Sequence, residues 1–138
     1  MKAVEHGDER YLLVKQSSKS SRVRDPATGE ERYLPNEELT VLDDGPLKTA
    51  AAAVEPPLRA LLRATNDDRG LGLLVELHAD GPLAVRDLLA RYDLCESDAL
   101  GLVTEFRVAG LVRETTVAAE RGYALTDRGR EAVDALLS

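Results

Sequence analysis

Apolar residues recur with two different spacings along this chain, and the spacing changes at the polar segment 43–46 (DDGP). Before this segment, short runs rich in strand formers are separated by polar turns, at residues 10–15 (RYLLVK), 21–24 (SRVR) and 31–34 (ERYL). After it, apolar residues recur every three or four positions, which is typical of amphipathic helices. The pattern predicts an α+β fold, in which a small N-terminal antiparallel β unit precedes a mainly helical remainder.

The β unit is predicted to contain a hairpin at residues 25–29 (DPATG). The proline of this segment has a fixed φ that suits a turn, and the glycine adopts a positive φ at little cost. A loop over residues 26–29 would place Arg24 opposite Glu31. Because so few strands are marginally stable alone, we expect this sheet to pack on the rest of the chain or on a partner.

Two helices are expected after the β unit. The alanine-rich segment 47–55 (LKTAAAAVE) favours a helix, and the two prolines that follow end it and begin a second helix over residues 57–64. The chain is therefore expected to consist of a small β-hairpin or meander unit (1–42), a helical linker (43–66) and a C-terminal domain (67–138). The linker is also a candidate for dimerisation.

The C-terminal domain has a specific order of predicted elements. They are a helix over 68–79, a helix over 85–92, a short turn, a helix over 96–109, extended segments over 113–117 and 121–125, and a last helix over 127–137. Thr126 is expected to cap the last helix. Two helices, a short turn, a helix, a hairpin and a helix form the order of a winged helix-turn-helix domain.

Two segments of this domain resemble known regulators. Residues 94–112 (LCESDALGLVTEFRVAGLV) resemble the recognition-helix segment of MarR, ArsR and PadR-like transcriptional regulators, in which this helix ends in AGLV. Residues 123–131 (YALTDRGRE) resemble their second wing strand as it enters the last helix. The resemblance covers about residues 67–138 and implies DNA binding by the helix 96–109 and the wing 113–125. The whole chain also resembles an uncharacterised family of small proteins from halophilic archaea, which implies no function.

The predicted recognition helix has one face that could meet DNA. At helical steps of about 100° its apolar face, which we expect to be buried, consists of Ala99, Leu102, Val103 and Phe106. The resemblance adds two wing arginines, Arg113 at the base and Arg121 at the tip. The expected DNA contacts are Ser97, Leu100, Gly101, Thr104, Arg107, Val108, Arg113 and Arg121. Since arginine is the only strong base reader among them, we expect weak discrimination between bases.

The charge of the chain is unfavourable for DNA binding, with one local exception. The formal net charge is −7, which opposes an approach to phosphates. Arginine outnumbers lysine, as in proteins of salt-loving archaea, and at about 1 M salt the Debye length is only about 3 Å, so an acidic surface hardly repels DNA. Residues 10–24 contain no acidic residue, and a phosphate-binding surface is predicted from Arg10, Lys15, Lys19, Arg22 and Arg24. Alternatively, these cations pair with the protein's own acidic helices or with another subunit.

Several function classes are disfavoured by the sequence. No catalytic or nucleotide-binding motif is present, so we expect neither an enzyme nor a cofactor. Cys95, His6 and His78 are too few for a metal cluster. Cys95 is expected to be a small turn residue that packs inward, with a redox role as the alternative. Without an apolar run or a signal peptide, the chain is expected in the cytoplasm and not in a membrane.

The leading hypothesis is therefore a transcriptional regulator that binds double-stranded DNA as a homodimer. The helices over 47–64 and 127–137, the latter with Val133, Leu136 and Leu137, are the expected dimer surfaces. The alternative is a winged-helix protein interaction module or adaptor subunit of a transcription, replication or segregation complex. It would use the apolar residues Leu100 and Val108 beside carboxylates.

Overall fold

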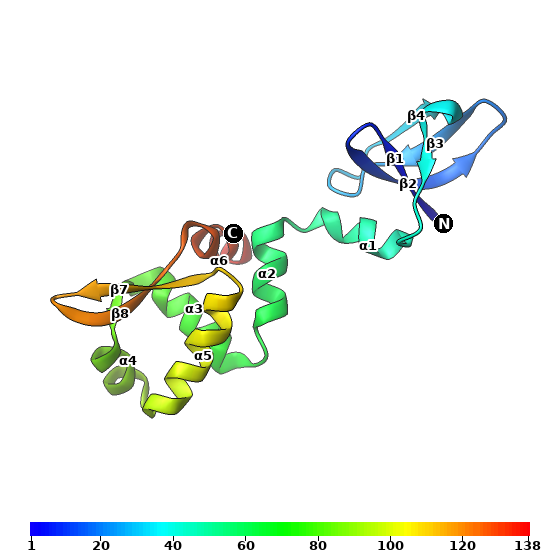
Figure 1. Ribbon diagram of the computed structural model, residues 1–138. Coiled ribbons are helices and arrows are strands. Elements are labelled where there is room, and N and C mark those ends of the chain that lie inside the picture. Colours follow the sequence, from blue (N-terminus) through cyan, green and yellow to red (C-terminus); the bar gives the residue numbers. More distant parts are fainter. The chain divides into compact units, whose positions relative to one another are not determined.

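The structure, a computed structural model, describes residues 1–138 and has two compact units, Met1–Glu55 and Pro56–Ser138. As predicted, the fold is α+β, with antiparallel sheets and six α-helices (Figure 1). The boundary between the units lies within the segment expected to be a helical linker, so one of its helices belongs to each unit. None of the helices has the length and apolar character needed to cross a membrane.

The N-terminal unit is a five-stranded antiparallel sheet with the strand order β4-β3-β2-β1-β5. Its elements are β1 (Lys2–His6), β2 (Glu9–Gln16), β3 (Ser20–Arg24), β4 (Glu31–Pro35), the 3₁₀ turn η1 (Asn36–Glu38) and β5 (Thr40–Val41). The three predicted strands correspond to β2, β3 and β4, and Arg24 lies opposite Glu31 as expected. The sequence analysis did not predict β1 and β5. The strand β5 has only two residues and pairs with β1, which is distant in sequence, whereas β1 forms a local hairpin with β2.

Apolar residues of this sheet form a small core, and one short helix packs beside two of its strands. The core on one face consists of Val4, Tyr11, Val23 and Leu34. The short helix α1 (Pro46–Ala50) lies against β1 and β2, and the 3₁₀ turn η2 (Ala51–Ala53) follows it. The predicted helix over 47–55 is therefore too long. Val54 is already extended. Glu55 stands directly before Pro56, a position at which helical backbone is disfavoured.

The C-terminal unit contains five helices and a three-stranded sheet with the order β6-β8-β7. Its elements are α2 (Pro56–Ala64), α3 (Asp68–Asp80), β6 (Leu83–Ala84), α4 (Val85–Tyr92), α5 (Glu96–Val108), β7 (Val112–Val117), β8 (Glu120–Leu125) and α6 (Asp127–Leu137). Thr126 caps α6, as predicted, by accepting a hydrogen bond of 3.0 Å from the amide of Gly129. The strand β6 has only two residues, too few to give a periodic signal.

The core of this unit is built around α5 and α6. Among its most buried side chains are Leu61, Leu74, Leu88, Phe106, Leu111 and Val133. The ring of Phe106 reaches α3 at Gly70, where a Cβ atom would lie only 3.2 Å from it. The burial of Val133 contradicts the expectation that this residue lies on a dimer surface, because the helix presents it to its own core.

The end of α5 is fixed by a Schellman motif. The amide of Gly110, whose φ is 77°, donates to the carbonyl of Arg107, and the amide of Leu111 donates to the carbonyl of Phe106. The Leu111 side chain is fully buried. The AGLV segment therefore ends the helix and directs the chain at once into β7.

Candidate nucleic-acid interface

The helix α5 is buried on one side and open on the other. Ala99, Val103 and Phe106 are buried, as the helical spacing predicted, whereas Leu102 is only half-buried. Opposite them, the expected DNA-facing residues Ser97, Leu100, Gly101, Thr104 and Val108 are exposed. A Cβ atom at Gly101 would meet nothing within 4 Å, so this face has no cover within its own unit.

The exposed face of α5 offers few free hydrogen-bond donors. The Thr104 hydroxyl donates to the carbonyl of Leu100 at 2.7 Å, and the Ser97 hydroxyl lies 3.3 Å from the Cys95 sulfur. Glu105 accepts a hydrogen bond of 2.9 Å from Asn66 on one flank of the helix. The face can approach a partner closely, but its side chains recognise bases weakly.

The wing is a hairpin of β7 and β8 that extends away from the helices (Figure 1). Its tip is the two-residue turn Ala118–Ala119, with φ values of 49° and 67°. The second wing strand was expected to begin at residue 121, but it begins one residue earlier, because Val117 already pairs with Glu120. Arg121 therefore lies within β8, opposite Thr116, and not at the tip.

One carboxylate connects the two arginines expected to contact DNA. Glu114 of β7 lies 3.1 Å from Arg121 Nε through Oε1, and 3.8 Å from Arg107 Nη1 through Oε2. We call Arg107, Glu114 and Arg121 the Glu114 cluster. The sequence reasoning missed Glu114, although the hairpin register places residues 114, 116 and 121 on one face of the wing.

Arg121 is also held by its neighbour in β8. Its guanidinium donates a hydrogen bond of 2.7 Å to the hydroxyl of Tyr123 and lies 5.7 Å from the centre of that ring. The interaction with Tyr123, and to a smaller extent Glu114, raises the pKa of Arg121 above its ordinary value. Arg121 is therefore a permanent cation in a fixed orientation on the side of the wing.

The other arginines near α5 are mostly paired with carboxylates. Arg86 pairs with Glu120, and Arg69 lies 3.4 Å from Asp98. Arg113 is exposed on β7 and forms no ion pair within 4 Å. Exposed pairs of this kind contribute at most about 1 kcal/mol each, so a phosphate could replace their carboxylates at little cost.

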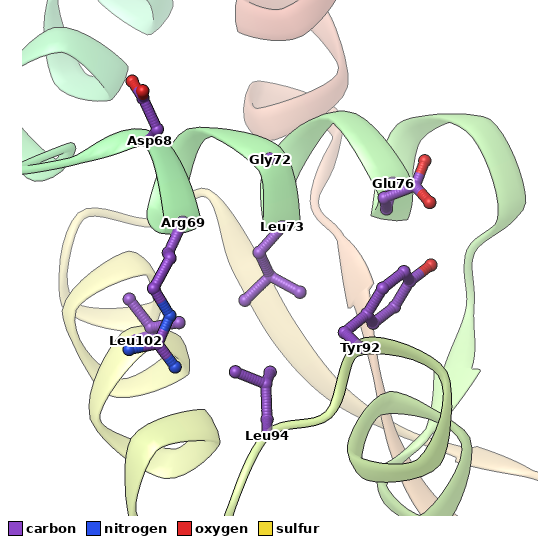
Figure 2. Close-up of a pocket in the computed structure, with 8 residues that line it drawn as sticks. All are labelled: Asp68, Arg69, Gly72, Leu73, Glu76, Tyr92, Leu94 and Leu102. Atoms are coloured by element: carbon purple, nitrogen blue, oxygen red, sulfur yellow. The ribbon is translucent and has the colours of Figure 1, made fainter.

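A separate hollow of about 230 Å³ lies between α3 and the turn that precedes α5 (Figure 2). In Figure 2, Leu73 and Leu94 point toward each other across it, and Gly72 leaves its wall without a side chain. The Tyr92 hydroxyl beside it is buried without a hydrogen-bond partner. Burial, and secondarily the carboxylate of Glu76, raises the pKa of Tyr92. No resident ligand is needed to account for this small hollow.

The remaining candidate residues lie outside this interface. Cys95 is exposed at the N-cap of α5, so the expected inward packing is wrong; its sulfur lies near the exposed Ser97 hydroxyl and not in the core. His78 contacts Asp134 of α6 at 2.6 Å, and His6 contacts Glu38 at 3.4 Å. The basic residues over 10–24 belong to the N-terminal sheet.

A helix-turn-helix with an exposed second helix, followed by a hairpin wing and a packed last helix, defines a winged helix-turn-helix domain. The chain belongs to the family of unknown function DUF7346, whose model matches residues 1–137. It is also similar to the crystal structure of the transcriptional regulator HlyU from Vibrio vulnificus CMCP6, with 27% sequence identity and a TM-score of 0.51. This similarity covers 66% of the present chain and 90% of that chain. No curated protein matches the chain.

Proposed function

We propose that this protein is a DNA-binding transcriptional regulator that inserts α5 into the major groove and lays the wing along the adjacent backbone. The observation that carries this proposal is the open face of α5, centred on Gly101 and flanked by Arg107 and Arg121. The similarity to HlyU and the resemblance to MarR, ArsR and PadR-like regulators support it. The excess of acidic residues, and of arginine over lysine, supports a halophilic archaeon as its source.

The chemistry of the interface favours backbone contacts over base contacts. Arg107 and Arg121 are exposed cations that suit phosphate oxygens, whereas Ser97 and Thr104 distinguish bases poorly. Arg113 is also exposed, but it lies on the opposite face of the wing from Arg121. The carboxylates of Glu96 and Asp98 lie in the first turn of α5 and oppose a close approach to DNA at low salt. We therefore infer that sequence preference includes DNA shape and deformability.

Glu114 has a defined role in this proposal, since it must release Arg107 and Arg121 when phosphates arrive. We predict that Glu114→Gln tightens duplex DNA binding about two- to five-fold, because one competing negative charge is lost. Fluorescence anisotropy with a labelled duplex measures the change. Glu131→Gln on the exposed side of α6 changes the net charge equally and serves as the control. Equal tightening in both variants would assign the effect to net charge and not to the Glu114 cluster.

We also propose that the regulator binds as a homodimer. Leu62 of α2 and Leu137 of α6 are 56% and 57% exposed, and α2 and α6 pack on each other within the C-terminal unit. Their exposed apolar side chains could be covered by a second copy. A two-fold dimer requires a palindromic DNA site, which the following experiment can detect.

The decisive experiment selects binding sites from random duplex DNA in high potassium chloride. We expect wild-type protein to enrich a palindrome, and both Arg107→Ala and Arg121→Ala to lose most of the binding. Arg130→Ala, which removes an exposed arginine of α6 that pairs with Asp127, is the matched control and should bind as wild type. The absence of enrichment over repeated rounds would contradict the proposal.

A second candidate function is a winged-helix adaptor that binds protein. Val108 is 85% exposed and lines an open groove between α2 and α5 with Ala60 and Ala64. Such an exposed apolar residue beside carboxylates suits a protein interface. If the selection yields no DNA site, this groove becomes the leading candidate for the functional surface.

A further inference from the structure

One face of the N-terminal sheet combines basic residues with an aromatic ring. In the strand register, Lys15 of β2 lies opposite Arg22 of β3, and Arg22 lies opposite Tyr33 of β4. Directly opposed residues on antiparallel strands share a face of the sheet, and Arg24, two residues from Arg22, lies on the same face. We call Lys15, Arg22, Arg24 and Tyr33 the Tyr33 face.

Tyr33 is distinguished from the other aromatic residues by its exposure. Its side chain is 61% exposed, whereas Tyr11, Phe106 and Tyr123 are buried and Tyr92 is half-buried. The neighbouring Leu34 points into the core instead, so Tyr33 is not required to bury the sheet. The protein therefore presents an aromatic ring to solvent on the edge strand β4, beside cations of the next two strands.

Ion pairs within the sheet leave most of these cations available. Neither Lys15 nor Arg24 lies within 4 Å of a carboxylate oxygen, whereas Arg22 pairs with Glu31 at 3.4 Å. Glu31 lies opposite Arg24 on the same face of the sheet. Arg10, at the other end of the expected phosphate surface, pairs with Asp44 at 2.9 Å. The structure thus separates the predicted basic set into Lys15 and Arg24, which have no carboxylate partner, and Arg10 and Arg22, which do.

An exposed ring beside free cations fits one type of ligand. Nucleic-acid bases stack on aromatic rings, and cations beside the ring neutralise the phosphates of the same strand. Neighbouring strands are about 4.8 Å apart, so Lys15 lies about 10 Å from Tyr33, within reach of a nearby phosphate. A duplex keeps its bases stacked inside, so only an unpaired strand can use the ring.

We propose that the Tyr33 face binds single-stranded nucleic acid, with one base stacked on Tyr33 and phosphates held by Lys15, Arg22 and Arg24. Lys19, in the loop between β2 and β3, extends the same positive region. This site is independent of the function proposed for α5. It would give the protein a second nucleic-acid contact that does not recognise sequence.

The test measures binding of fluorescent oligo(dT) and oligo(rU) to the full chain by anisotropy. To exclude the wing, all variants are made in the Arg107→Ala, Arg121→Ala background. Tyr33→Thr, which keeps a good strand former, should weaken binding about 5- to 150-fold, and Tyr33→Phe should restore it. The double variant Lys15→Gln, Arg24→Gln should lower the salt slope by about 1.4, whereas Arg10→Gln should leave binding unchanged.

Three outcomes would overturn the proposal even if an oligonucleotide binds. The first is unchanged oligonucleotide binding by Tyr33→Thr when its thermal unfolding midpoint is preserved. The second is a loss of binding in Arg10→Gln as large as that in the double variant Lys15→Gln, Arg24→Gln. The third is an affinity for a duplex, or for an acidic peptide of the same charge, equal to the affinity for the oligonucleotides. No binding to either oligonucleotide would also overturn it. A preference for oligo(rU) over oligo(dT), or the reverse, identifies which nucleic acid supplies the strand.

Discussion

Gly101→Glu is expected to abolish specific duplex DNA binding while the protein stays folded. Gly101 lies at the centre of the exposed face of α5, and a new side chain there meets nothing in the protein. In a complex it would place bulk and a carboxylate against the DNA, where like charges cost several kcal/mol. The affinity should therefore fall on the order of 100-fold or more. Anisotropy titrations with the selected duplex measure the loss.

The chain offers a closely matched control for this variant. Gly72 is also an exposed glycine inside a helix, where an added Cβ atom would meet nothing within 4 Å, and Glu76 follows it as Glu105 follows Gly101. Both substitutions replace glycine by a better helix former and add one negative charge. Gly72→Glu should keep wild-type affinity. If both variants bind normally, α5 does not enter the groove; if both lose binding, net charge is responsible.

The winged-helix unit could be predicted from sequence because its signals are local. The cap formed by Thr126 could be predicted from the few residues around it. The AGLV segment predicts the end of a helix, because its glycine can adopt the positive φ that such an end requires. The buried face of α5 follows from helical spacing alone. Such features depend on residues within one or two turns of each other, which a sequence shows directly.

The parts that sequence reasoning missed depend on pairing between distant residues. The strands β5 and β6 have two residues each, too few for a periodic signal, and exist because another strand is present beside them. The link between Arg107 and Glu114 crosses from a helix to a wing strand. Likewise, Arg10 pairs with Asp44, which lies 34 positions away in the sequence. The sequence alone therefore could not show which basic residues between 10 and 24 have a carboxylate partner.

Phe106→Ala is expected to cost the C-terminal unit about 3–5 kcal/mol of unfolding free energy, the usual loss for a buried phenylalanine. Phe106 is 1% exposed, and its ring packs against the backbone of α3 at Gly70. Because glycine has no side chain to move into the space, the cavity should stay open and the loss should be in the upper part of this range. A loss below about 1 kcal/mol would show that α5 is not anchored by this ring.

Urea denaturation followed by far-UV circular dichroism measures this loss, since five of the six α-helices lie in the C-terminal unit. Leu100→Ala is the control on the same helix, because Leu100 is 48% exposed and its truncation should cost far less. Phe106→Ala by itself also tests how the interface depends on the core. If Phe106 fixes the position of α5, Phe106→Ala should weaken DNA binding even at temperatures where the unit remains folded. If the ends of α5 alone fix its position, the folded Phe106→Ala variant should bind DNA as wild type does.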